Sequence, residues 1–462
     1  MGIVGGGIAG LAAGCVLSHA GFRVSLFERR PFVGGRASSY EHPGTGEIVD
    51  NCQHVLLGCC TNLLDFYRRI GVAEKIQWFD RLTFIEPGGR RSEIGPSALP
   101  APLHSSPSFL RASSLSWSDK IAISRAMLAL MGQLPPDSPK SFADWLREHQ
   151  QTQGAIDRFW KVVLVSAINE DLDRISVRYG AQVFRESFLK SAEAGRMGVP
   201  TVPLSDLYSR AISYIEGHDG KVHLRTSVEG VVSEQNGVVL KSTGAAESFD
   251  FVVLAVPHNA LDKLLPSQNG SGETSAELRA QIAKFESSPI TGIHLWFDRE
   301  ITDLPHAVLL DRTIQWLFQK SKLQPQRQGA EQAGSYIELV VSSSKSLVAM
   351  GRQEILDLAL RELAEFFPTV REAQLLKATV VKEVHATYSA LPGSDDYRPA
   401  SQTPWPRIFL AGDWTATGWP ATMEGAVRSG YAAAENVIQE IGQPASILVP
   451  DLKATGIMWL FG

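Results

Sequence analysis

The start of the chain contains a run of glycines between a short apolar segment and a segment of small residues. Gly5, Gly7 and Gly10 follow the pattern GxGxxG, after β-type residues 2–4 and before a predicted helix over 10–19. Glycines at these positions allow a tight turn and a close approach of the backbone to a pyrophosphate. The N-terminus of the helix presents free N–H groups and the positive end of its dipole to phosphates. The loop predicts dinucleotide contacts at Gly5, Gly7, Ile8, Ala9 and Gly10.

A second predicted strand, over 23–28, completes a βαβ unit and ends in an acidic residue. Glu28 follows Gly7 by about 20 residues, the spacing at which a carboxylate accepts hydrogen bonds from ribose hydroxyls. The alternative to a nucleotide site is a purely structural turn. We also expect the natural chain to begin a few residues earlier, because Met1 lies so close to the glycine loop that it shortens the first strand.

A second glycine element follows within residues 29–36. Gly34 and Gly35 bring the backbone close to a ligand, and an arginine can reach phosphates or the edge of a ring. By itself the segment would be a plain turn with a solvated arginine. Beside the first loop, it adds Arg29, Gly34, Gly35 and Arg36 as candidate ligand contacts.

The third element lies near the C-terminus, where a buried-type strand over 408–411 leads into a loop and a long predicted helix over 422–441. Pro420 and Thr422 suit the start of that helix, as a residue of fixed φ and as an N-cap. Asp413 is the candidate for a hydroxyl of a ribose or ribityl chain, and its alternative role is to cap the loop. The candidate contacts here are Gly412, Asp413, Thr422 and Met423.

The charge balance excludes some classes of partner. The 462 residues include 44 Lys+Arg and 49 Asp+Glu, a net charge of −5, so no basic excess is available for a nucleic-acid backbone.

The cysteines, at positions 15, 52, 59 and 60, are too few for a disulfide scaffold and lack zinc-site spacing. We expect a reducing compartment, no metal site and no membrane-spanning helix, because no run of 18 apolar residues occurs.

The pattern along the chain predicts an α/β fold, α+β overall, with a Rossmann-type domain assembled from separated pieces and a second domain inserted between them. Residues 87–116 read as a loop because they are rich in Pro, Ser and Gly. Helices are predicted over 118–134, from 141, over 156–169 and near 179–189, and strands over 222–225, 228–233, 237–241, 251–255, 293–297 and 336–341. The predicted nucleotide-binding pieces are 1–75, 201–262 and 401–442, the substrate-domain pieces are 76–200 (mainly helical) and 263–400 (sheet plus helices), and 443–462 is a tail.

The three elements, in this order and at these distances, resemble the FAD-dependent amine oxidase and phytoene desaturase superfamily. Two glycine motifs at the start and a Gly-Asp motif near the end are a signature for FAD rather than NAD. The resemblance implies that a strand at Val228 passes its backbone by the adenine.

Several segments are more specifically similar to the hydroxysqualene dehydroxylases, also called squalene-associated FAD-dependent desaturases. These segments are DNCQHVLLG at 50–58, FWKVVLVSAINEDLDRISVRYGAQVFRE at 159–186, GVPTVPL at 198–204 and GWPATMEGAVRSG at 418–430. One departure is Cys52, where the family has glycine. If that position needed a positive φ, cysteine would be strained there.

This resemblance implies the reductive removal of a hydroxyl from hydroxysqualene to give squalene, in bacterial hopanoid or related triterpene synthesis. Hydride would pass from N5 of the reduced flavin to an allylic carbon as water leaves, inside a long apolar tunnel of the inserted domain. His54 is the candidate proton donor, and its alternative is a structural histidine that binds the flavin or a neighbouring loop. Gln53 and His54 are also candidate flavin contacts, and Asp50 is expected to anchor the loop.

Three other functions remain open at this stage. An oxidative carotenoid-type desaturase would use the same FAD but create double bonds. An amine oxidase would need an aromatic cage, for which Trp414 and Trp419 are the weak candidates. A prenyl-lipid carrier on the same scaffold would need no functional flavin. We expect a cytoplasmic protein with peripheral contact to the inner face of the cytoplasmic membrane, through the helix over 118–134 and the tail 447–461; the electron donor is not predicted.

Overall fold

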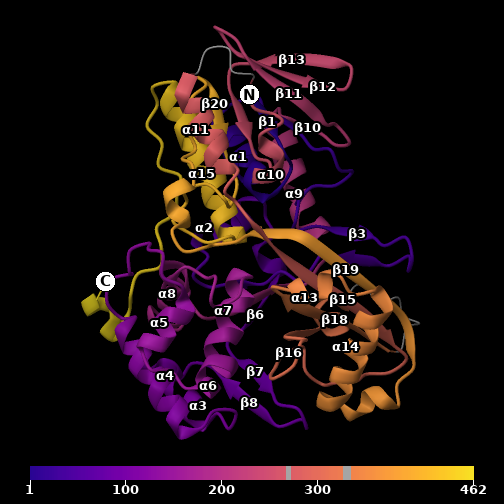
Figure 1. The fold of residues 1–462 in the computed structure, drawn as a ribbon. Helices are drawn as coiled ribbons and strands as arrows, with labels where there is room; N and C mark the ends of the chain where they lie inside the picture. The colour runs from indigo at the N-terminus through magenta and orange to yellow at the C-terminus, as the bar shows by residue number, and fades with distance from the viewer. Residues whose placement is uncertain (267–271, 326–333, 462) are drawn as a thin grey trace.

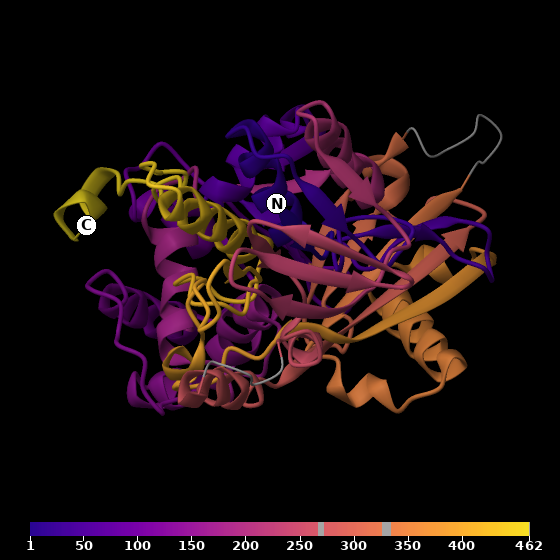
Figure 2. The same ribbon diagram turned by 90° about the horizontal axis from the view of Figure 1, so that it is seen from above.

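The computed structural model describes residues 1–266, 272–325 and 334–461. Three regions are visible in Figure 1: a nucleotide-binding region around the N-terminus, a helical lobe, and a lobe built on a large sheet. Seen from above in Figure 2, the C-terminal segment extends beside the helical lobe. The chain passes between the regions several times, so each region combines distant parts of the sequence.

The nucleotide-binding region is a five-stranded sheet in the order β10-β2-β1-β14-β20. Every pair of neighbours in it is parallel, and numbering these strands along the chain gives the order 3-2-1-4-5 of a Rossmann-type sheet. Its strands are β1 (Gly2–Val4), β2 (Ser25–Phe27), β10 (Lys221–His223), β14 (Val252–Leu254) and β20 (Ile408–Leu410), and its helices are α1 (Ile8–His19), α2 (Thr61–Arg69), α9 (Leu204–Glu216) and α15 (Met423–Glu440). The predicted Rossmann-type arrangement is therefore confirmed.

Three small sheets border this region. The antiparallel sheet of β11 (Val228–Ser233), β12 (Val238–Ser242) and β13 (Ala245–Phe249) lies at its outer end in Figure 1. The second pairs β3 (Ser39–Glu41) with β4 (Ile48–Asp50), and the third joins β5 (Leu56–Leu57), β9 (Met197–Pro200) and β6 (Ile76–Phe79).

The sheet lobe contains seven strands in the order β19-β15-β18-β17-β16-β7-β8. The strands are β19 (Leu375–Tyr388), β15 (Ser287–Phe297), β18 (Ser335–Ser342), β17 (Trp316–Gln319), β16 (His306–Leu309), β7 (Leu82–Ile85) and β8 (Arg91–Ile94). Helix α14 (Arg352–Phe366) packs its apolar side against this sheet. Shorter helices in the same half of the chain are α10 (His258–Leu261), α11 (Gly272–Ile282), α12 (Lys320–Leu323) and α13 (Lys345–Val348).

The helical lobe packs around a cluster of buried aromatic rings formed by Phe142, Trp160 and Phe184. Two of its helices start with capping boxes, at Ser116 with Asp119 and at Ser141 with Asp144, and the second of these helices starts where the sequence predicted one. The lobe contains α3 (Ser106–Arg111), α4 (Trp117–Ala129), α5 (Phe142–Glu148), α6 (Gln153–Ala155), α7 (Lys161–Ile168) and α8 (Val177–Phe184), with π-helical turns at Ile156–Trp160 and Arg185–Leu189.

Several local predictions were wrong. Residues 87–116 are not all loop, because they include β8, which pairs with β7, and the helix α3. The helix predicted over 118–134 ends earlier, at Ala129, and strand β13 was missed. Two of these errors concern strands, β8 and β13, which are defined by hydrogen bonds to a partner strand rather than by their own sequence pattern. Strands β7 and β8, from the segment 76–200, lie in one sheet with strands β15 to β19 from the segment 263–400.

A buried histidine in this sheet makes stability depend on pH. His306 lies in β16 with its ring edge-on to Phe79, at 4.6 Å between ring centroids. Burial lowers the pKa of His306 from 6.5 to about 4. The unfolded chain takes up this proton near pH 6.5 and the folded chain only near pH 4. The neutral, buried His306 therefore contributes fully to the free energy of unfolding above pH 6.5, and this contribution is lost as the pH falls toward 4.

We expect His306→Phe, which keeps a ring but cannot be protonated, to remove this pH dependence. Between pH 7 and 4.5 the wild-type free energy of unfolding should fall by roughly 2–3 kcal/mol more than that of the variant. Urea unfolding at several pH values measures the difference, with His218→Phe, at an exposed histidine, as the control. Parallel pH profiles for wild type and His306→Phe would contradict this assignment.

Candidate FAD and substrate site

A cavity of about 690 Å³ lies where the carboxyl ends of the parallel strands face the sheet lobe. Its volume falls within the usual range of ligand pockets. The predicted contacts that line it are Gly5, Gly7, Ile8, Ala9, Glu28, Arg29, Gly34, Gly35, Arg36, Gln53, His54, Val228, Gly412, Asp413, Thr422 and Met423. Residues chosen from five separate parts of the sequence are thus brought to one cavity. Their contact with FAD stays a prediction.

Gly10 is the exception, because it does not line the cavity. A Cβ at Gly10 would lie 2.0 Å from the carbonyl oxygen of Gly5, so the glycine is needed for the packing of helix against loop. Gly5 itself has a φ of +107°, which only glycine adopts without strain. The structure thus gives Gly10 a packing role, and its contact with FAD stays a prediction.

The two glycine elements lie directly on each other. The Gly34 N–H donates to the carbonyl of Gly6 at 2.8 Å, and a Cβ at Gly35 would lie 3.1 Å from the Cα of Gly7. Gly7 is also the N-cap of α1 and has no side chain to cap the helix. A Cβ at Gly7 would meet no protein atom within 4 Å, so this position faces open space. The two glycine elements together form a glycine cradle, made of Gly5, Gly6, Gly7, Gly34 and Gly35. This cradle offers free helix N–H groups beside a space that fits a pyrophosphate.

The carboxylate of Glu28 is held in place by the backbone. Its two oxygens accept from the N–H groups of Gly6 and Arg30, each at 2.8 Å. Glu28 is buried and lines the cavity. A carboxylate oxygen can accept more than one hydrogen bond. Glu28 therefore links the two glycine elements and can still accept from a ribose hydroxyl.

Arg36 and Asp413 meet across the cavity although 377 positions separate them, with 2.6 Å between Nη2 and Oδ1. Arg36 also donates to the carbonyl of Ala386 at 3.0 Å. This ion pair joins the second glycine element to the Gly-Asp motif near the C-terminus. The structure thus gives Arg36 a protein partner, where the sequence suggested a phosphate or a ring edge.

The segment 50–55 lines the cavity through residues 51–55 and is anchored by a buried ion pair that sequence reasoning missed. The ammonium of Lys320 donates to Asp50 at 2.5 Å and to the Gln53 side chain at 2.7 Å, and Glu338 lies 3.3 Å away. Asp50 is therefore a loop anchor, as predicted. Lys320 carries no recognisable motif, because its partners are far away in the sequence. The backbone at Cys52 does not have a positive φ, so the strain considered for the family's glycine position is absent.

His54 faces the cavity with a defined tautomer. Its Nδ1 lies 2.7 Å from the carbonyl oxygen of Cys52, and because a carbonyl can only accept, Nδ1 carries the proton. The nitrogen left for a ligand is Nε2. Burial lowers the pKa of His54, so the ring is neutral at pH 7 and its Nε2 accepts a proton more readily than it donates one.

Outside the glycine cradle, the lining includes an apolar group: Val55, Ala167, Ile290, Trp316, Phe318 and Val340. Polar lining residues from the same lobes are Ser166, Asn169, Ser342, Glu383 and Thr387. Trp414 lines the cavity and donates from its ring nitrogen to the carbonyl of Val256 at 3.1 Å, whereas Trp419 is not among the lining residues. The two tryptophans considered for an amine cage do not meet there.

The model of the family described as flavin containing amine oxidoreductase matches residues 8–438. The chain belongs to this family. It is an FAD-dependent oxidoreductase, and the family resemblance found in the sequence is confirmed at this level. The glycine cradle and the open helix N-terminus fit the pyrophosphate of FAD.

Among curated proteins, similar relatives are carotenoid enzymes. A probable zeta-carotene desaturase from Synechococcus elongatus is 28% identical, over 95% of this chain and 98% of the relative. A 15-cis-phytoene desaturase from the same organism is 27% identical, over 94% and 95%. Similar solved structures are an oxidoreductase from Methanosarcina mazei (18% identical, 95% and 99% covered, TM-score 0.72) and a putrescine oxidase variant (16%, 95% and 98%, TM-score 0.70), which show the fold alone. These relatives favour the desaturase alternative over hydroxysqualene dehydroxylation.

Proposed function

We propose that this protein is an FAD-dependent oxidoreductase that introduces double bonds into a long apolar polyisoprenoid, as a carotenoid-type desaturase does. The observation that carries the proposal is the cavity, whose lining combines the glycine cradle with an apolar cluster that includes Ile290, Phe318 and Val340. A hydrocarbon chain gains free energy by leaving water for such a surface. The desaturase names of relatives that align over nearly the whole chain support this direction of the reaction.

In this reaction FAD supplies the acceptor for a hydride. The protein must hold the chain, exclude water and remove a proton from the neighbouring carbon, so that the electron pair of the C–H bond becomes the new double bond. Neutral His54, with Nδ1 bound to Cys52 and Nε2 left for a ligand, suits the role of proton acceptor. This reverses the role suggested by the sequence, in which His54 donated a proton.

The second candidate is the reductive dehydroxylation of hydroxysqualene to squalene. It is favoured by the position of the segment that resembles hydroxysqualene dehydroxylases, because Asn51, Cys52, Gln53, His54 and Val55 of this segment all line the cavity. This reaction needs a proton donor for the departing hydroxyl. The neutral state of His54 argues against that residue as the donor.

An anaerobic single turnover distinguishes the two candidates. Oxidised protein is mixed with phytoene or zeta-carotene, and chemically reduced protein with hydroxysqualene, while flavin absorbance and extracted products are followed. Desaturation predicts bleaching of the oxidised flavin and a product two hydrogens lighter. If the reduced flavin is reoxidised and an equal amount of squalene forms, the protein is a dehydroxylase and not a desaturase. If neither arm reacts, both candidate functions are contradicted.

We propose further that the protein contacts a lipid surface through apolar residues of the helical lobe and the tail. No helix within the described residues could cross a bilayer. Trp117 and Leu128 on α4 are 67% and 66% exposed, and Trp459 and Leu460 of the tail are 73% and 71% exposed. The tail lies against the lobe, because Arg185 donates both to the carbonyl of Met131, just after α4, and to that of Phe461.

We expect Trp459→Ser/Leu460→Ser to weaken binding to anionic liposomes at least tenfold, because two large apolar side chains no longer leave water. Liposome flotation measures the bound fraction. The control is Leu376→Ser, which removes an exposed apolar side chain from β19 in the sheet lobe. Equal flotation of the tail variant and wild type would show that the tail is not part of the lipid-binding surface.

A further inference from the structure

Arg398 is a buried cation between the helical lobe, the end of β19 in the sheet lobe, and the loop that follows β20. We define residues 411–422, between β20 and α15, as the cofactor loop, because Gly412, Asp413 and Thr422 in it line the cavity. The side chain of Arg398 has no exposed surface. An arginine is rarely buried without several partners, so its contacts indicate what it does.

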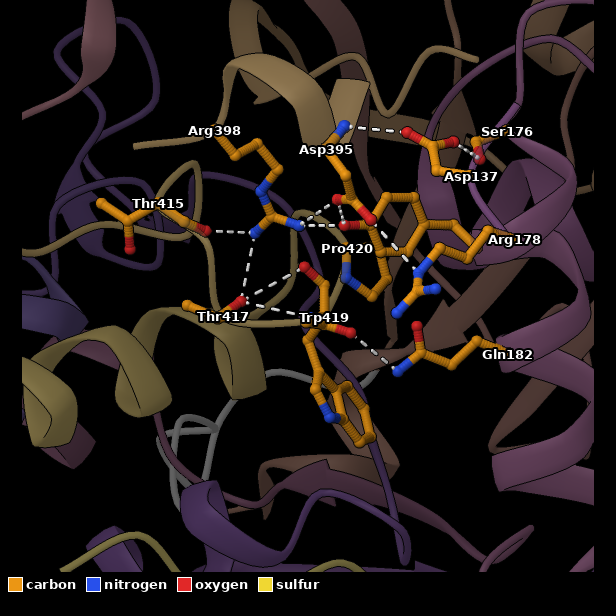
Figure 3. Close-up of polar contacts among 12 residues, drawn as sticks. Asp137, Ser176, Arg178, Gln182, Asp395, Arg398, Thr415, Thr417, Trp419 and Pro420 are labelled. Atoms are coloured by element: carbon orange, nitrogen blue, oxygen red, sulfur yellow. Dashed lines mark hydrogen bonds and ion pairs between the residues drawn. The ribbon is translucent and has the colours of Figure 1, made fainter. Parts of the chain in front are cut away.

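One nitrogen of the Arg398 guanidinium holds the cofactor loop (Figure 3). Nη2 donates to the carbonyl of Asp413 at 2.9 Å. It also donates to the carbonyl of Thr415 and to the hydroxyl of Thr417 at 3.1 Å, and these two contacts are drawn in the figure. Buried carbonyls require donors, and a planar guanidinium can serve several from one position. The conformation of the loop is therefore shaped around this side chain.

The other side of Arg398 faces the helical lobe and the sheet lobe. Nη1 donates to the hydroxyl of Tyr179 in α8, which in turn donates to Asp395, and Asp395 pairs with Arg398 at 3.6 Å. The guanidinium lies 5.2 Å from the ring centroid of Tyr388 and 5.5 Å from that of Tyr179, within the range of cation–π attraction. Tyr388 ends strand β19, which carries the cavity residues Ala386 and Thr387.

A second layer of contacts fixes this arrangement. The backbone N–H of Asp395 donates to Asp137 at 2.9 Å, and Asp137 also accepts from Ser176 just before α8. Gln182 of α8 donates to the carbonyl of Gly418 in the cofactor loop at 3.0 Å. The loop, α8 and the end of β19 are thus held together around Arg398.

We propose that Arg398 is a positioning residue for FAD. It holds the cofactor loop against α8 and the end of β19 without touching the cofactor. The carbonyl it holds belongs to Asp413, whose carboxylate pairs with Arg36 at 2.6 Å inside the cavity. Loss of Arg398 frees that backbone and displaces Asp413 and Gly412 together. The inference rests on FAD binding and not on the identity of the hydrocarbon.

The test compares Arg398→Met and Arg398→Lys with wild type, using refilled apoprotein and no hydrocarbon substrate. We expect the FAD dissociation constant of Arg398→Met to rise about tenfold or more, because several charge-assisted hydrogen bonds to the loop are lost. The visible circular dichroism of bound FAD should also change. Arg398→Lys should recover only part of both, since a single ammonium cannot reproduce the planar fork.

Arg178→Gln is the matched control, because Arg178 pairs with Asp395 at 3.2 Å and its contacts in Figure 3 do not include the cofactor loop. Its FAD affinity should stay within about twofold of wild type, as expected for a partly exposed ion pair. If Arg398→Met does not fold, Arg398→Lys decides. Unchanged FAD affinity and flavin dichroism in Arg398→Lys, even with a lower unfolding temperature of the apoprotein, would overturn the proposal in favour of a purely structural arginine.

Discussion

Replacing Gly7 with alanine is expected to abolish tight FAD binding while leaving the folded apoprotein intact. A Cβ at this position would meet no protein atom within 4 Å, so the fold has room for the methyl group. The same space faces the cavity at the free N-terminus of α1, where a pyrophosphate must approach the backbone closely. The methyl group would occupy the place of the ligand rather than of the protein.

We expect the FAD dissociation constant of Gly7→Ala to rise by about 100-fold or more, equivalent to roughly 3 kcal/mol. The unfolding temperature of the apoprotein should stay close to that of wild type. Titration of apoprotein with FAD and thermal unfolding without FAD measure the two quantities. Gly132→Ala is the control, because it also adds a methyl group in open space but lies outside the cavity. Unchanged FAD affinity in Gly7→Ala would show that the cofactor does not lie against this loop.

The second large effect is expected at His54. In His54→Asn the amide nitrogen can replace Nδ1 as donor to the carbonyl of Cys52, which keeps the loop, but nothing replaces Nε2. If Nε2 accepts the substrate proton, turnover should fall by about 10²- to 10⁴-fold. The cavity wall should stay in place, because the loop is still anchored through Asp50 and Lys320. FAD affinity, measured beside turnover, separates the loss of a proton acceptor from the loss of the predicted flavin contact.

The pH profile separates a base from an acid at His54. Because burial lowers its pKa below 6.5, the neutral base predominates above that pH and is lost as the pH falls. Desaturation by wild type should therefore be constant between about pH 7 and 8 and decline on the acidic side. Turnover measured across pH should lose this acidic decline in His54→Asn. A wild-type rate of desaturation that does not decline on the acidic side would contradict His54 as the proton acceptor.

The glycine cradle could be predicted from sequence because its demands are local. A turn at Gly5 with φ of +107° excludes almost any other residue, and a helix must start where its N–H groups are free. The start of the helix at Ser141 is local in the same way, since both partners of its capping box lie within one turn. Such features leave a pattern of residue types at fixed short spacing.

Distant contacts leave no such pattern. The partners of Lys320 in the segment 50–53 are about 270 positions away, and Arg398 joins the cofactor loop to a tyrosine 219 positions earlier. Strand β8 forms only because β7 lies beside it, although its own surroundings read as a loop. A single lysine or arginine looks the same in sequence whether it is solvated or buried.

The sequence by itself therefore determined the class of cofactor and the Rossmann-type region, because close backbone approach to a dinucleotide requires glycines at particular positions. Only the tertiary structure decided how the site works. It placed Arg36 on Asp413, fixed the tautomer of His54 through Cys52, and buried Arg398 behind the cofactor loop. Those arrangements depend on burial and on charges brought together from far apart in the chain, which the order of residues does not display.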